Sequence, residues 1–477
     1  VEGVTVRSEL TWAVDMGTYD SLPKDDPQKE PDEEMQRAAK RLAAQFRTTI
    51  LCFSWLLGCL ISVLGLASSE FGVRLGGWTN GALYLTYTLF NFFAPLCLKK
   101  YGCRWSFVIG QSCYMLYLIA SLLPRYYTLV PTALLAGCGG AVLWTAQGTY
   151  TTKAALAYSK LMNTTEHKAF GHFNGIFNTI FQGVVFFAHL LTSLILSAKF
   201  LPHSSRLAIL YSIFAVGAFI ATVGVSFFKD PPEGEGKAKD EESLSGVKAT
   251  DAAAVNPKEI IAETFYLAFE PKMLMLSGTN LAFGFVTSFV SVYVNSKIIT
   301  DHLGDSTLGW FACIQQVSSF VLAYPYAWAS NRSEVIGRPI VMLAGALSFC
   351  IVLGMFRFIP LHTYDTTATA WALLVIAHIA LGSGVTVWQG TCAAVFSDYY
   401  SATPEPAFAN IKLWSGLGSA IAFFLFPLIS RDAMVIICGI TTVGGYAGYL
   451  LSHVVHRFEK RKKAGLVDSD AKAPLLS

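Results

Sequence analysis

Side chains that could bind a solute or move a proton are rare within the long apolar stretches of this chain. Those stretches contain no Asp or Glu, and Lys412 is their only permanently charged residue. His189 and His378 are the only titratable groups well inside them. A charged group deep in a bilayer is costly and persists where it is used. The lack of carboxylates therefore argues against a common type of proton symporter, but it leaves open a uniporter, an exchanger of neutral solutes, or sodium held by neutral oxygens.

Polar side chains recur at helical spacing in several of these stretches. At 100° per residue, Asn174, Asn178, Gln182 and His189 fall within an arc of about 80°. Similar candidates for a solute cavity occur in four other stretches: Trp144 and Gln147, Asn280 and Ser291, Trp388 and Gln389 beside His378, and Lys412. Two interpretations remain open for the amides and histidines, because such groups either line a cavity or form hydrogen bonds between packed helices.

No catalytic or cofactor-binding motif is present. The chain lacks GxSxG, HExxH and a phosphate-binding loop, and its acids and histidines form no triad pattern. The ten cysteines lie in or beside apolar runs, with no CxxC pair. We therefore expect no enzyme activity, no cofactor, no metal site, no structural disulfide and no nucleic-acid partner.

The elements that must position these residues are membrane-spanning helices. Of the 477 residues, 53% are hydrophobic and 14% are charged, whereas a soluble domain has about 25% charged residues. Apolar runs of the length that crosses a bilayer recur along the chain. They predict an all-α membrane protein with twelve transmembrane helices in two pseudo-symmetric six-helix bundles, 46–229 and 259–455. The predicted spans are 48–68, 79–98, 105–123, 129–152, 172–197, 207–228, 273–296, 308–328, 339–356, 371–396, 409–430 and 434–455.

Polar segments flank and separate the two bundles. We expect a disordered cytoplasmic tail over 1–45, a cytoplasmic linker over 230–258 and a cytoplasmic tail over 456–477. With this topology, and counting loop and tail residues from Arg37 on, 24 basic residues lie on the side of the termini and 7 on the other side. Because cytoplasmic loops collect Lys and Arg, both termini are predicted to be cytoplasmic. The segment 259–270 is amphipathic, and it either lies along the membrane interface or extends span seven.

A short internal repeat supports two equivalent halves. Span four contains Gly140-Ala-Val-Leu-Trp144, and span ten contains Gly384-Val-Thr-Val-Trp388. Related halves arranged about an axis along the membrane normal are an architecture of secondary transporters.

The chain resembles the Unc-ninety-three-like branch of the major facilitator superfamily over most of 46–455. The resemblance is carried by Leu143-Trp-Thr-Ala-Gln-Gly-Thr-Tyr150 and by Phe173-Asn-Gly-Ile-Phe-Asn-Thr-Ile-Phe-Gln182. The superfamily's loop motif between spans two and three is degraded here, since Pro95 and Lys99 replace its first glycine and its aspartate. The resemblance implies the fold and a membrane location. It also implies one of three roles: regulator of potassium channels, trafficking companion of receptors, or transporter.

Two functional hypotheses follow, and both have the lipid bilayer as surroundings. In the first, the protein moves a small solute through a neutral polar central cavity by alternating access. In the second, it is a non-transporting regulatory or trafficking partner of an ion channel or receptor. The polar stripes favour the first hypothesis, and the carboxylate-free spans with the degraded loop motif favour the second. The choice between plasma membrane and an endomembrane or vacuolar location stays open.

Overall fold

Every regular element that the structure describes is helical. The computed structural model describes residues 32–164, 166–198, 200–228, 230, 257–332, 337–400 and 404–463. The long helices of the first half are α1 (Glu33–Glu70), α2 (Val73–Phe90), α3 (Ala94–Ala120), α4 (Tyr126–Leu161), α5 (Glu166–Leu196) and α6 (His203–Ser226). Those of the second half are α9 (Pro271–Phe289), α11 (Leu308–Arg332), α12 (Gly337–Phe358), α13 (Thr367–Thr386), α15 (Pro404–Leu425) and α16 (Arg431–Lys463). Shorter elements are α8 (Pro257–Ala268), η1 (Val290–Ile299), α10 (Thr300–Leu303), η2 (Asp305–Thr307), η3 (Leu361–Asp365), η4 (Val387–Thr391), α14 (Cys392–Tyr399) and η5 (Phe426–Leu428).

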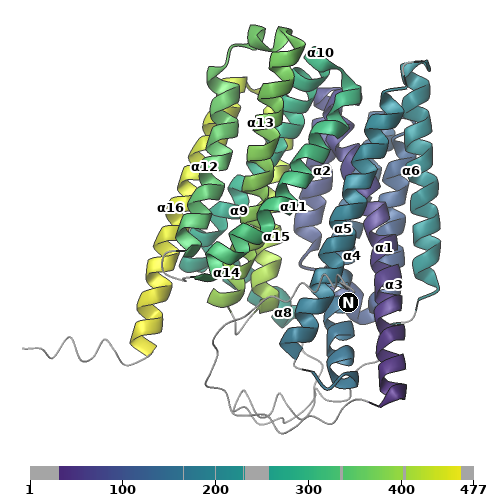
Figure 1. Cartoon of the computed structure of the whole chain (residues 1–477), viewed down its shortest axis with the longest axis vertical. Helices are drawn as coiled ribbons and strands as arrows, with labels where there is room; N and C mark the ends of the chain where they lie inside the picture. Colours follow the sequence, from purple (N-terminus) through teal and green to yellow (C-terminus); the bar gives the residue numbers. More distant parts are fainter. Residues whose placement is uncertain are drawn as a thin grey trace, which may run out of the picture.

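The long helices run up and down between two ends of an elongated bundle (Figure 1). We call one end the linker end, because α6 ends there and α8 begins there. The start of α1 and the end of α16 lie at this end as well. We call the opposite end, where α10 lies, the far end.

The outer faces of the bundle are strongly apolar. Exposed side chains on α6 include Val216, Phe219 and Ile220, and those on α11 include Phe320 and Val321. Such belts suit lipid and would promote association in water. By length and hydropathy, nine helices in the described part of the chain are able to cross a membrane, or ten if α2 and α3 form one bent span. The protein is therefore a multi-pass helical membrane protein. Each of the twelve predicted spans coincides with helix over most of its length, and twelve crossings stay a prediction.

The same helix pairs pack together in the two halves. In the first half α1 contacts α5 and α6, α4 contacts α2 and α3, and α3 contacts α6. In the second half α9 contacts α15 and α16, α13 contacts α11 and α12, and α12 contacts α16. Gly140 faces Tyr114 of α3, and Gly384 of the repeat faces Phe349 of α12, which is the equivalent helix. The predicted pseudo-symmetry of the two halves therefore has a counterpart in their packing.

Two predicted boundaries are wrong. The tail was expected to reach residue 45, but α1 begins at Glu33, where the Asp32 side chain accepts a 2.8 Å hydrogen bond from the Met35 amide. A polar, charged first part of a long helix has no apolar signal, so the hydropathy pattern missed it. The span predicted at 79–98 also crosses the break between α2 and α3. Residues 1–31, 231–256 and 464–477, which hold most of the predicted tails and linker, lie outside the described residues.

Several helices are interrupted at places that the sequence did not indicate. The segment α8 is a helix separate from α9, because the chain turns at Glu270 before Pro271. Simple extension of span seven, one of the two predicted alternatives, is therefore wrong. Spans seven and ten contain the π-helical segments η1 and η4. Segments of this kind are frequent at functional sites.

Candidate functional site between the two halves

The two halves meet closely toward the far end. Asn295 of η1 donates a hydrogen bond of 3.2 Å to the Gly65 carbonyl oxygen of α1. The Ser193 hydroxyl of α5 donates one of 3.0 Å to the Ser306 carbonyl oxygen. At Gly309 a Cβ atom would lie 2.4 Å from the His189 carbonyl oxygen, so α11 and α5 touch backbone to backbone. These contacts bring the halves together at this end.

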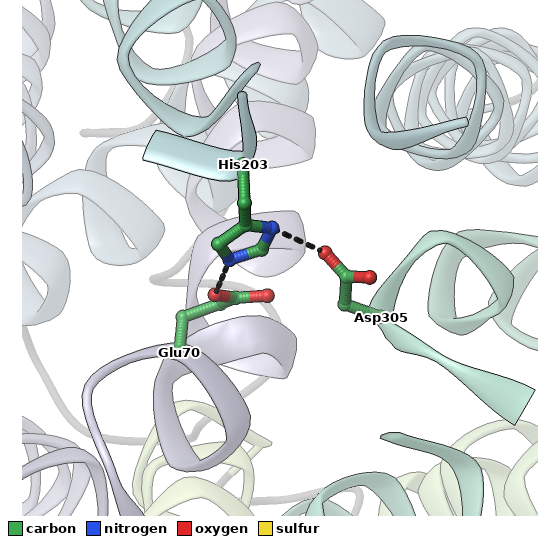
Figure 2. A group of neighbouring side chains, drawn as sticks. All are labelled: Glu70, His203 and Asp305. Atoms are coloured by element: carbon green, nitrogen blue, oxygen red, sulfur yellow. Dashed lines mark hydrogen bonds and ion pairs between the residues drawn. The ribbon is translucent and has the colours of Figure 1, made fainter. Parts of the chain in front are cut away.

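A charged cluster also joins the halves at the far end. His203 Nε2 lies 3.0 Å from Glu70 Oε2, and His203 Nδ1 lies 2.9 Å from Asp305 Oδ2. Figure 2 shows the imidazole ring standing between the two carboxylates. Glu70 and His203 belong to the first half and Asp305 to the second, so this cluster is a further contact across the interface.

Toward the linker end the polar stripe of α5 becomes exposed. At its middle, the Gln316 side-chain amide of α11 donates a hydrogen bond to Gln182 Oε1, so the stripe faces the other half. Asn178 and Asn174 follow one and two turns nearer the linker end, and both are exposed. Lipid offers such amides no hydrogen-bond partner. Because they share a face with Gln182, their exposure indicates that the halves separate below this residue.

A cation from the second half lies over an aromatic ring of the first half. Lys412 Nζ of α15 is 5.3 Å from the centroid of the Trp144 ring of α4. Trp144 is held by the rings of Phe53 and Phe181, at centroid distances of 5.2 and 5.8 Å. Lys412 is exposed, and among the described residues no carboxylate forms an ion pair with it. A cation–π contact is favourable, but it leaves the lysine charge available to an anion.

Other predicted candidates make contacts inside the protein. Gln147 is 8% exposed and donates to the Thr151 hydroxyl at 3.0 Å. His189 Nδ1 lies 3.1 Å from the Ser62 hydroxyl oxygen of α1. His378 Nδ1 lies 2.8 Å from the Leu374 carbonyl oxygen within its own helix.

The remaining candidates lie in spans seven and ten. Asn280, Ser291 and Trp388 each have a buried polar atom without a hydrogen-bond partner among the described residues. Gln389 follows Trp388 in η4 but is exposed. Adjacent residues of η4 thus have different surroundings, since one is buried and the other is exposed.

Sequence reasoning missed two groups of residues. Gln316 stands beside Gln315 in an otherwise apolar stretch, and this polar pair was a usable signal. Glu70, His203 and Asp305 lie in three separate connections between spans, and no local motif links them. Only the folded chain brings these three side chains together.

Comparison with known families decides which family the chain belongs to. Residues 74–449 match the family described as ion channel regulatory protein UNC-93. The chain belongs to the UNC-93 family. Its relatives include UNC93-like protein 3 of Arabidopsis thaliana, 26% identical over 369 residues, covering 76% of each chain. Protein unc-93 homolog A of Homo sapiens is 23% identical over 398 residues, covering 76% of this chain and 80% of its own.

Solved transporters share the fold of this UNC-93 family member. The nucleoside transporter NupG aligns with a TM-score of 0.61 and 14% identity, covering 86% of this chain and 98% of its own. The xylose transporter XylE from E. coli, in an inward open conformation, aligns with a TM-score of 0.58 and 12% identity, covering 87% and 95%. These similarities establish the major facilitator fold for the chain.

Proposed function

We propose that the protein is an alternating-access membrane carrier of a small organic anion. In this proposal Trp144, Asn174, Asn178, Gln389 and Lys412 line a cavity that opens at the linker end. Lys412 attracts the negative charge, Trp144 offers an aromatic face, and the amides provide hydrogen bonds.

Lys412, which has no ion-pair partner among the described residues, is the observation that carries the proposal. A lysine between two halves of a membrane protein is costly unless water or an anion surrounds it. Packing alone would favour an apolar residue at this place. The lysine is therefore best explained by a negatively charged or acceptor-rich solute that binds beside Trp144.

The close contacts between the halves at the far end support the proposal that the carrier works by alternating access. A carrier of this fold exposes its binding site to one side at a time by rocking its halves. The contacts around Gly309 and Ser193 close one side, whereas Asn174 and Asn178 are exposed toward the other side. This arrangement corresponds to a state open to the linker end.

Uptake into proteoliposomes tests the proposal. Purified protein is reconstituted, and counterflow is measured with labelled benzoate and pyruvate beside neutral glucose and uridine. We expect counterflow with at least one anion, reduced at least tenfold in Lys412→Met but not in Lys297→Met, an exposed lysine of η1. Counterflow of a neutral solute that is equal in wild type and Lys412→Met would contradict the proposal that the carried solute is an anion.

A second candidate function has its own support. The family is described as ion channel regulatory, so a non-transporting regulator that binds another membrane protein is the alternative. It predicts no counterflow with any solute, together with co-purification of a channel subunit from native membranes. Apolar belts such as the one on α11 provide faces for such a partner.

A further inference from the structure

We propose that Glu70, His203 and Asp305 form a binding site for a transition-metal ion of the Zn²⁺ type, and that the bound ion holds the far end closed. One ligand atom from each of the three side chains lies within 4.8 Å of the others. One imidazole nitrogen and two carboxylate oxygens are ligands that zinc accepts, at about 2.0–2.2 Å, with water in the fourth position. Binding would require the His203 ring to reorient, because Glu70 now contacts its Nε2 and Asp305 its Nδ1.

A buried oxygen without a partner supports a cation at this place. The Glu70 side chain is 6% exposed, and its Oε1 atom has no hydrogen-bond partner among the described residues. In Figure 2 this oxygen points toward Asp305 rather than toward the His203 ring. Two carboxylates that face each other repel. A divalent cation between them would satisfy the Glu70 oxygen and remove this repulsion.

The other two ligands can reach an ion that arrives from solvent. The side chain of His203 is 47% exposed, and that of Asp305 is 19% exposed. His203 is the first residue of α6, and Asp305 begins the short helical turn η2. An exposed imidazole at a helix start has room to rotate, so one of its ring nitrogens can turn toward an ion between the two carboxylates.

The positive charge of Arg206 lies close to the site and opposes the binding of a cation. Its Nη2 atom lies 3.5 Å from His203 Nδ1, and its Nη1 atom donates to the Leu196 carbonyl oxygen. With a neutral imidazole, the two carboxylates and this guanidinium leave one net negative charge. A divalent ion is therefore still attracted, more weakly than to an isolated pair of carboxylates.

Because of the position of the site, a bound ion would connect the two halves of the protein. Glu70 and His203 end α1 and begin α6 in the first half, whereas Asp305 lies between α10 and α11 in the second. An ion bound to all three would link the halves and stabilise the state in which the far end is closed. Binding of the ion can be measured whether or not the protein transports a solute, so failure of this proposal is distinguishable from failure of the carrier proposal.

Metal binding to the purified full-length protein tests the site. Melting temperature and calorimetric titration are measured with ZnCl₂ near neutral pH in wild type, His203→Ala, Asp305→Asn and His362→Ala. His362 is an exposed histidine of η3 and serves as the matched control. We expect one zinc ion per chain and a rise of several degrees in wild type and His362→Ala. The rise should be lost in His203→Ala and reduced in Asp305→Asn, which keeps the shape of the side chain.

Three outcomes would overturn the site. The first is no zinc response of the wild type up to millimolar concentration. The second is an equal response of wild type and His203→Ala, since zinc would then bind elsewhere. The third is an equal stabilisation by CaCl₂ and ZnCl₂, because a hard cation prefers oxygen and does not need the imidazole.

Discussion

Lys412 Nζ lies 5.3 Å from the centre of the Trp144 ring, and the two residues belong to different halves of the molecule. The contact connects α15 with α4, two turns from the linker-end start of α15. Because the halves of this fold move against each other, the distance between the two side chains depends on the conformational state. A solute that binds between them would therefore favour one state over the other.

The Gln182–Gln316 hydrogen bond should contribute to stability, whereas Asn178 should not. Gln182→Ala removes an amide pair between α5 and α11, which costs about 0.6–2 kcal/mol in membrane proteins. Asn178 is exposed one turn away, so Asn178→Ala removes no such bond. We expect a lower melting temperature in detergent for Gln182→Ala and an unchanged one for Asn178→Ala. An equal loss in both variants would mean that the stripe is buried along its whole length.

Gly309→Ala should loosen the far end. A Cβ atom at Gly309 would lie 2.4 Å from the His189 carbonyl oxygen and 2.5 Å from the Ser193 hydroxyl oxygen, so α11 must move away from α5. Cys313, one turn further along α11, is 5% exposed and should react faster with a thiol reagent once the helices separate. Peptide mapping after alkylation measures this rate.

Gly183→Ala is the matched control for this variant. Nothing lies within 4 Å of a Cβ atom at Gly183, and both substitutions gain the same helix propensity of Ala over Gly. The rate at Cys313 should be unchanged in Gly183→Ala. A slow rate in both variants would contradict the close packing of α5 against α11.

Flux through the protein should depend weakly on a proton gradient. The predicted spans contain no Asp or Glu, and His189 and His378 already have the Ser62 hydroxyl and the Leu374 carbonyl as partners. Reconstituted uptake with and without an imposed pH difference measures the dependence. A tenfold increase with the gradient that disappears in His189→Ala would show that this histidine carries the proton.

Both ends of the chain and the linker should face the cytosol. The start of α1, the end of α6, the start of α8 and the end of α16 lie at the same end of the bundle (Figure 1), and basic residues are concentrated on this side. Protease added outside sealed vesicles should leave the linker intact, and protease on the cytosolic side should cut it. Cleavage from outside, or a glycan on Asn163, would reverse the topology.

The architecture could be predicted from the sequence because membrane spans and their repeat are local patterns. The apolar runs, the repeat from Gly140 to Trp144, and the basic loops each need only a short window. The site was predictable in part, since Lys412 stood out as the only permanently charged residue of the spans and Trp144 was among the cavity candidates. Their contact was not predictable, because it depends on how two helices far apart in the chain pack.

Three other features could not be predicted from local sequence patterns, because they also depend on tertiary structure. Trp388 of η4 is buried and Gln389 is exposed, and the sequence names both as candidates without separating them. The partner of Gln182 comes from the other half of the chain. The cluster of Glu70, His203 and Asp305 requires the end of α1, the start of α6 and η2 to meet. In each case the tertiary structure determines what the residue can do.

The role of Lys412 is tested most directly by ligand-induced stabilisation. Melting temperature is measured for wild type, Lys412→Met, Lys412→Arg and Lys297→Met with organic anions and with neutral analogues of the same size. If Lys412 binds the solute, an anion stabilises wild type and Lys297→Met, Lys412→Arg keeps part of the effect, and Lys412→Met needs at least tenfold more ligand. The same stabilisation of wild type and Lys412→Met, or a preference for the neutral analogue, would contradict the proposed function.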